Sequence, residues 1–312
     1  AASEAMSEPT SIRCEVEDRV ATVWLHRPHR HNAWTGRMHA EFRQVMADLE
    51  PRDDVRAVVV TGTPPAFSVG GDSQALAGHA DKGGYDTGLP AEPARPGTWY
   101  PGDGGAGPDL DGRGRGGTAN GATEGVDDPA GSGLDARLDA DMTWQLAYRH
   151  PIVAAVNGAC AGVALALVAF CDLRFVAADA KLTTAAPKLG LPAEYGLSWI
   201  LPRLIGVTRA NDLLLSGRVV TGAETAEWGL WNGVEADGEA TLAAARDYAR
   251  SLAATTGPNA VTVTKRQLAE DLLRHDPAAS VGDSIRLLDE AMRTAEYREG
   301  VAALRDKRPP RF

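Results

Sequence analysis

The spacing of apolar and polar residues predicts short buried strands that alternate with helices. Apolar runs bounded by turn residues predict strands at residues 12–17, 20–26, 56–61, 152–156 and 173–177. Apolar residues at helical spacing predict helices at about 35–49, 134–149, 197–204 and 209–216, the first with Thr35 as its N-cap. From Gly222 onward the pattern is helical almost throughout, with breaks near residues 238, 257, 276 and 300. Strands that alternate with helices and end in a helical tail indicate an α/β protein.

Residues 78–133 interrupt this pattern. The segment holds 17 of the chain's 34 glycines and 6 of its 19 prolines, and large apolar side chains are nearly absent from it. Such a composition cannot bury enough apolar surface to offset the entropy of ordering the chain. We therefore expect a flexible insertion rather than a domain. It is either an inert surface excursion or a mobile flap near a site, because long loops in compact domains are often functional.

Charge and cysteine content exclude several classes of protein. Lysine and arginine total 32 against 42 acidic residues, a formal net charge of -10, which argues against a nucleic-acid binder. The three cysteines, Cys14, Cys160 and Cys171, form no CxxC motif, so we expect no metal site and a reducing, cytoplasmic setting. No apolar run approaches the length of a membrane span, so no membrane partner is expected. Residues 1–10 carry no signal-peptide pattern and are expected to form a disordered leader.

Two glycine-containing turns that join a strand to a helix are the strongest candidates for chemistry. They span residues 67–72 and 157–164. Backbone N–H groups at the start of a helix have no helical acceptor, and the helix dipole adds partial positive charge there. Two such groups that converge can hold a carbonyl oxygen that becomes negative during a reaction. Taken alone, each turn is better explained as a tight structural turn.

Several motifs, in consistent order, resemble those of one enzyme family. Residues 25–33 resemble an LxRPxxxNA segment, residues 66–72 an AFxAGxD segment, residues 151–158 (PIVAAVNG) a consensus block, and residues 171–174 a CDxR strand. Residues 201–206, 221–229 and 297–310 resemble later blocks and the C-terminal ending. The chain thus resembles the crotonase superfamily, which includes enoyl-CoA hydratases and isomerases, over nearly its whole length outside the insertion.

The resemblance implies a crotonase-like spiral of ββα units in residues 11–220. It implies a helical C-terminal region in residues 221–312 that packs in a homotrimer or a dimer of trimers. The implied substrate is an acyl-CoA thioester, with coenzyme A as part of the substrate and no separate cofactor. An oxyanion hole is implied at the N–H groups of Gly71 and Val163. At position 163, valine replaces the usual glycine of the family and narrows the approach to the oxyanion hole. The resemblance also assigns substrate or CoA binding to Arg27, Asn32, Ala33, Phe67, Asp72 and Gly162.

The two glutamates with which hydratases of this family activate water are absent. The resemblance places them at positions 166 and 186, and both are alanine here, Ala166 and Ala186. Glu194 stands where some isomerases of the superfamily carry their acidic residue, so it is the expected catalytic residue. One carboxylate is enough to move a double bond. It can remove a proton from the acyl chain and return it elsewhere while an oxyanion hole holds the enolate.

We therefore expect an isomerase-type enzyme that shifts a double bond in an enoyl-CoA. Two alternatives remain open. A hydratase or lyase would need a second acid from the insertion, for example Asp81 or His79. A catalytically silent CoA-ester-binding homologue would need no acid at all, and the retained Glu194 counts against that alternative.

Overall fold

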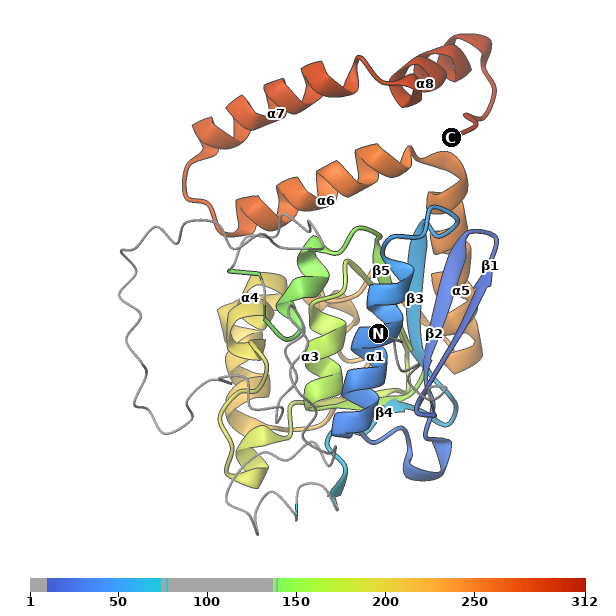
Figure 1. Ribbon diagram of the computed structural model, residues 1–312. Coiled ribbons are helices and arrows are strands. Elements are labelled where there is room, and N and C mark those ends of the chain that lie inside the picture. The colour runs from blue at the N-terminus through green and yellow to red at the C-terminus, as the bar shows by residue number, and fades with distance from the viewer. Residues whose placement is uncertain (1–9, 74–76, 78–136, 139) are drawn as a thin grey trace, which may run out of the picture.

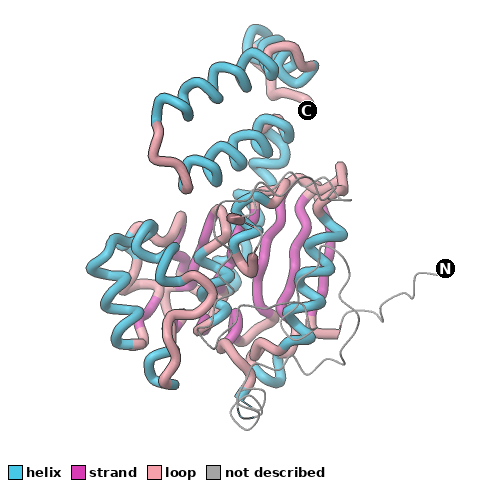
Figure 2. The backbone as a smooth tube through the Cα atoms, turned by 60° about the vertical axis from the view of Figure 1, so that its left-hand side comes forward, coloured by secondary structure: helices cyan, strands magenta, loops and turns pink. Residues whose placement is uncertain are grey.

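The computed structural model describes residues 10–73, 77, 137–138 and 140–312. The expected insertion at 78–133 and the expected leader, apart from Thr10, lie outside these residues. In the described part, a large twisted sheet lies between helices, and the last helices form a layer beyond one end of its strands (Figures 1 and 2).

The larger sheet has the strand order β1-β2-β3-β5-β7-β10 within the described residues. The strands are β1 (Ile12–Glu17), β2 (Val20–Leu25), β3 (Ala57–Gly62), β5 (Ile152–Val156), β7 (Leu173–Ala177) and β10 (Gly233–Glu235). The first two form an antiparallel hairpin, and each later pair is parallel. The five strands predicted from the sequence are confirmed to within one residue at each end.

Both faces of the central strands β3 and β5 are buried. Successive side chains of a strand point to opposite faces, so each strand contributes to two cores. Val58 and Val60 of β3 belong to the larger apolar core, which also contains side chains of α1 (Gly36–Leu49) and α3 (Val163–Ala169). Val59 lies between them and packs in a second core with α5 (Gly238–Thr255). The continuous apolar run that predicted this strand is therefore typical of a parallel strand covered on both sides.

A smaller sheet lies beyond the C-terminal ends of the parallel strands. Its order is β4-β6-β8-β9, with bounds Ala66–Ser68 (β4), Ala159–Ala161 (β6), Lys181–Thr183 (β8) and Val220–Thr221 (β9). The first three strands follow β3, β5 and β7 of the larger sheet directly in the chain, and they pair in parallel. This repetition of paired strands forms the expected spiral. Asn157 links two of its turns, because its side-chain amide donates to the Gly62 oxygen at 2.6 Å.

The helices match the sequence predictions with two exceptions. Thr35 caps α1 as expected, since its hydroxyl accepts from Met38 N–H at 3.2 Å. The predicted helices at 197–204 and 209–216 are joined in α4 (Leu197–Ser216), which bends at Gly206. The remaining short elements are 3-10 turns: η1 (Pro28–Arg30), η2 (Thr143–Ala147), η3 (Ala186–Leu189) and η4 (Ala226–Trp228). No helix in the described ranges is both long and apolar enough to cross a lipid bilayer.

The predicted helix at 134–149 and the predicted break at Gly300 are both wrong. In the described part of 134–149, only the 3-10 turn η2 forms. Met142 before it has a positive φ of 68°, and the Thr143 hydroxyl donates to the Leu138 oxygen at 2.8 Å. Such a local bond between a hydroxyl and the backbone competes with a helix. Gly300 lies inside α8 (Ala295–Asp306), because one glycine costs a helix only about 1 kcal/mol.

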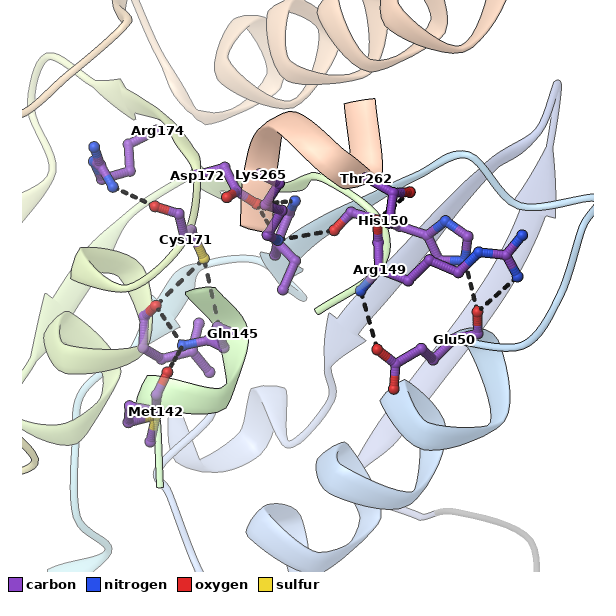
Figure 3. A network of polar contacts seen from close by, with 12 residues as sticks. Glu50, Met142, Gln145, Arg149, His150, Cys171, Asp172, Arg174, Thr262 and Lys265 are labelled. Carbon is purple, nitrogen blue, oxygen red and sulfur yellow. Dashed lines mark hydrogen bonds and ion pairs between the residues drawn. The ribbon is translucent and has the colours of Figure 1, made fainter. Parts of the chain in front are cut away.

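The last three helices form a layer beyond the ends at which β5 and β7 begin (Figure 1). They are α6 (Pro258–Leu272), α7 (Pro277–Ala291) and α8. Lys265 binds α6 to the residues that precede these strands (Figure 3). Its ammonium group lies 2.6 Å from a carboxylate oxygen of Asp172 and donates to the His150 oxygen at 3.0 Å. This layer exposes large apolar side chains: Leu268, Leu272, Val281, Ile285, Leu288, Met292, Val301 and Leu304.

Candidate active site

The two glycine-containing turns singled out in the sequence lie side by side. Strands β4 and β6, which lead into them, are paired in parallel through Ser68 and Cys160. The chains remain close beyond the strands. A Cβ atom on Gly70 would lie only 2.8 Å from the Ala161 oxygen, and Gly70 has a φ of +85°. Glycine is therefore required at this position, both by the close approach and by the backbone conformation.

The pairing of Trp34 with the first turn orients the Gly71 amide. Trp34 N–H donates to the Gly70 oxygen at 2.7 Å, and Asp72 N–H donates to the Trp34 oxygen at 2.9 Å. In this parallel bridge the residue between the two bonding groups is Gly71, so its own N–H points away from Trp34.

The second turn presents the Val163 amide. Gly162, with a φ of +53°, precedes α3, and its N–H donates to the Thr183 oxygen of β8 at 3.0 Å. Val163 is the first residue of the helix, so its N–H has no acceptor within the helix. Among the described residues, neither the Gly71 amide nor the Val163 amide donates a hydrogen bond to the protein. The Val163 side chain is buried.

Glu194 lies beside the second turn. It is placed between η3 and α4, and its Oε2 atom lies 3.4 Å from the position that a Cβ atom on Gly162 would occupy. Burial raises the pKa of the Glu194 carboxyl group. No other described residue forms a hydrogen bond or ion pair with its carboxylate. Ala166 and Ala186, where the resemblance places the hydratase glutamates, are both buried.

The buried Asp72 carboxylate of the first turn is paired with two arginines. Its side chain is 4% exposed and lies 3.2 Å from Arg27 Nη1 and 3.1 Å from Arg30 Nη2. The same Arg27 nitrogen donates to the Ala33 oxygen at 2.6 Å. A buried carboxylate needs such partners, because desolvation would otherwise make its charge very costly. The Arg27 side chain is 20% exposed, so a ligand can still reach it.

Two of the six residues assigned to substrate or CoA binding have side chains that serve the fold instead. Asn32 is fully buried, and its amide donates to the Thr63 and Ala66 oxygens at 2.7 Å each. Phe67 is fully buried in the larger core. The structure brings Arg27, Ala33 and Asp72 together around the first turn and places Gly162 beside Glu194.

The part played by Trp34 is not predictable from the sequence. Its main chain fixes the direction of the Gly71 amide, although 37 residues separate the two in the sequence. Spacing along the chain carries no signal of such a pairing, because it depends on how two turns of the spiral meet. The Arg30 contact with Asp72 was missed for the same reason.

The buried cysteines do not contribute a reactive thiolate. Burial raises the pKa of the Cys171 thiol to about 12, and it raises the pKa of the Cys160 thiol still further. The thiolate is the nucleophilic form of cysteine, so both thiols are unreactive at neutral pH. Within the described part of the chain, no three histidine, cysteine, aspartate or glutamate side chains gather closely enough to hold a metal ion.

Taken together, these groups can perform acid–base chemistry on a polarised carbonyl compound. The Gly71 and Val163 amides have no hydrogen-bond acceptor among the described residues, and the Glu194 carboxylate, whose pKa is raised, lies beside the second of the two glycine-containing turns.

Comparison with known proteins points the same way. A family model described as enoyl-CoA hydratase/isomerase matches residues 15–90 and 130–312. The chain is 28% identical to the 1,2-epoxyphenylacetyl-CoA isomerase of Escherichia coli, with 96% of this chain and 97% of that protein covered. It is 26% identical to the mevalonyl-coenzyme A hydratase of Beauveria bassiana, with 94% and 91% covered. The fold resembles the crystal structure of an enoyl-CoA hydratase from Bacillus anthracis, with a TM-score of 0.74, 21% identity, and 97% and 99% coverage. The chain therefore belongs to the enoyl-CoA hydratase/isomerase family, within the crotonase superfamily.

Proposed function

We propose that the protein shifts a carbon–carbon double bond in an enoyl-CoA thioester, with Glu194 as the only catalytic carboxylate. The observation that carries the proposal is the placement of a half-buried, unpaired Glu194 beside Gly162, while both hydratase glutamate positions are buried alanines. A water molecule with no acid or base to activate it is a poor nucleophile. Migration of a double bond needs no water at all.

The proposed reaction consists of two proton transfers. The thioester oxygen accepts hydrogen bonds from the Gly71 and Val163 amides. Glu194 takes a proton from C2 of a 3-enoyl group, and the electron pair of that C–H bond delocalises into a dienolate with its charge on the thioester oxygen. Protonated Glu194 then returns the proton to C4, which gives the 2-enoyl product. Each amide that holds such an oxyanion typically contributes about 10²–10³ in rate.

The raised pKa of Glu194 suits this role. A carboxylate that is too acidic removes a carbon-bound proton poorly, and efficiency improves as the pKa of the base approaches the working pH. Burial is the cause of the shift, since no charged neighbour contributes to it. The same carboxyl group, once protonated, is well placed to return the proton.

We propose that Arg27 and the Ala33 backbone contact the CoA portion and that Asp72 holds the first turn in position. The Arg27 side chain is partly exposed, and its guanidinium group already joins Ala33 to Asp72. In this arrangement a bound CoA meets a segment that is directly continuous with the Gly71 amide.

We further propose that the chain forms a homotrimer or a dimer of trimers through α6, α7 and α8. Helix α7 has no buried residue, and Ile285 and Leu304 are 63% and 81% exposed. Contiguous exposed apolar surface of this kind marks an interaction site. Sedimentation velocity should give a species of three or six chains, and a monomer at micromolar concentration would contradict this assignment.

A hydratase is the second candidate, because a relative at 26% identity is named as a hydratase. One assay separates the two. The purified protein should interconvert 3-enoyl-CoA and 2-enoyl-CoA faster than it hydrates 2-enoyl-CoA, and in D₂O it should introduce deuterium at C2 and C4. Hydration that outpaces isomerisation would favour the hydratase and would direct attention to Asp81 and His79 as the second acid.

A further inference from the structure

Three neighbouring side chains hold most of the unsatisfied polar atoms of the described interior. Five buried side-chain nitrogen or oxygen atoms lack a hydrogen-bond partner among the described residues. Four of them belong to Trp34 (Nε1), His39 (Nδ1 and Nε2) and Asp141 (Oδ2). Buried polar atoms are nearly always paired in folded proteins, so a group of this kind needs an explanation beyond packing.

His39 and Asp141 form a buried pair that joins two distant segments. His39 Nε2 lies 3.2 Å from Asp141 Oδ1, and the two side chains are 4% and 9% exposed. His39 comes from the first turns of α1, and Asp141 comes from the segment that leads into η2. An apolar pair of similar size would hold the two segments at least as well, because burying polar and ionisable groups is costly. Stability alone therefore does not account for the pair.

The pair is one side chain away from the first turn of the candidate active site. The His39 ring packs edge-on against Trp34 with 6.0 Å between ring centroids, and Phe42 packs against Trp34 at 6.1 Å. The main chain of Trp34 forms both hydrogen bonds that hold Gly70 and Asp72 and so direct the Gly71 amide. Any shift of His39 is transmitted to Trp34, because a close-packed interior leaves little room for independent movement.

We propose that His39 and Asp141 are positioning residues for the Gly71 amide. On this view, Asp141 fixes the His39 ring, the ring fixes Trp34, and Trp34 fixes the amide that polarises the thioester. Asp141 lies shortly after residues 78–136 in the chain. The pair therefore also connects the Gly71 amide to the part of the chain that follows that segment. The catalytic part of this inference rests on the proposed function, whereas the structural coupling between Asp141 and Gly71 does not.

Three variants test the coupling. Asp141→Ala removes the partner of His39. Asp141→Asn keeps a side chain of the same shape, with an oxygen in place of the one that lies 3.2 Å from His39 Nε2. The control is Tyr148→Phe, which also loosens the contact between η2 and α1 by removing the Tyr148 hydroxyl bond to the Met46 oxygen at 2.6 Å. Met46 lies near the other end of α1 from Trp34, and phenylalanine keeps the ring that packs against Trp144, so we expect this change to leave the Trp34 bridge intact.

Amide hydrogen exchange measures the coupling directly. The Trp34 and Asp72 amides donate the two bridge hydrogen bonds, so both should be protected in the wild-type protein. In Asp141→Ala their exchange should become at least about 10-fold faster, whereas Asp141→Asn and Tyr148→Phe should exchange like wild type at these two amides. Unchanged exchange of both amides in Asp141→Ala overturns the inference, whatever the activity of the variant.

Kinetics supply the second readout. For double-bond migration, Asp141→Ala should lower kcat by about 10-fold with KM within about twofold, because a misplaced amide stabilises the enolate less and leaves CoA contacts intact. Asp141→Asn should restore kcat to within about threefold of wild type, and Tyr148→Phe should retain it. Equal losses in Asp141→Ala and Tyr148→Phe would overturn the positioning role. A wild-type protein that does not move the double bond would refute the proposed function alone, and the exchange result would still decide the coupling.

Discussion

The two ends of the parallel strands differ in whether some of their polar groups are left without a partner in the chain. Where β5 and β7 begin, the polar groups of Glu50, Arg149, His150, Asp172 and Lys265 bind one another (Figure 3). Beyond the other end of these strands, the Gly71 and Val163 amides and the Glu194 carboxylate have no partner among the described residues.

This difference separates groups that hold the fold from groups that remain available for a ligand. At the beginning of the strands, charge is neutralised within the chain. Asp172 accepts from Lys265 at 2.6 Å and from Ile152 N–H at 2.7 Å. Burial there lowers the pKa of His150 to about 4, so its ring is neutral at pH 7 and serves as a hydrogen-bonding group. At the other end, burial raises the pKa of Glu194 with no partner to compensate, as is common at catalytic sites.

The sharpest way to test this contrast is Glu194→Gln. Glutamine has nearly the same shape as glutamate but cannot accept the substrate proton, so the rate of double-bond migration should fall by at least about 10²-fold. Binding of a CoA ester should stay within a few-fold, because the backbone amides are unchanged. Deuterium incorporation from D₂O measures the proton transfer directly.

The matched control for this change is Glu227→Gln, which alters an exposed glutamate in η4. It should leave the exchange rate at the wild-type value. Deuterium exchange that persists in Glu194→Gln would show that another group removes the proton, and it would break the proposed division between the two ends.

Lys265→Met addresses the opposite end. The substitution keeps the apolar stem but leaves Asp172 without its cation, and Asp172 is 23% exposed, so we expect a loss of about 2 kcal/mol in the free energy of unfolding. The activity of the folded enzyme should be unchanged. Urea unfolding and specific activity are the two measurements.

The matched control is Lys307→Met, which alters an exposed lysine after α8. It should change the free energy of unfolding by less than about 0.5 kcal/mol. If Lys265→Met lowered kcat in fully folded protein, the two ends of the strands would be coupled rather than independent.

The smallest expected effect is a displaced pH profile. Glu194 must be deprotonated to act as a base, so kcat/KM should rise with pH as this group in the free enzyme loses its proton. Because burial raises its pKa, the midpoint of that rise should lie above the ordinary value of 4.5. A midpoint at or below 4.5 would mean that Glu194 is solvated or paired in solution.

The strands were predictable from the sequence because their signal is local. A run such as 57–60 is apolar at every position, short and rich in valine, and together these features favour a strand covered on both faces over a buried helix. The cap of α1 by Thr35 was predictable for the same reason, since a hydroxyl at the start of an apolar helical repeat satisfies the first free N–H groups.

Other features depend on contacts between distant segments. The predicted helix at 134–149 failed because Thr143 bonds to backbone oxygens before it, and apolar periodicity does not register that competition. The resemblance named Glu194, Gly71 and Val163. It could not show that Asn32 is buried, that Trp34 directs the Gly71 amide, or that His39 meets Asp141. Each of these depends on which turns of the spiral lie next to each other.

The hydrogen-bond donors of the two glycine-containing turns belong to the main chain, and this has an evolutionary consequence. Most single substitutions leave a backbone N–H in place, so polarisation of a thioester can survive wide divergence in sequence under the proposed mechanism. The acid–base group is a side chain, and one codon change can remove or install it at positions such as 166, 186 or 194. A lineage built on this scaffold can therefore exchange one reaction for another while it retains activation of the same substrate class.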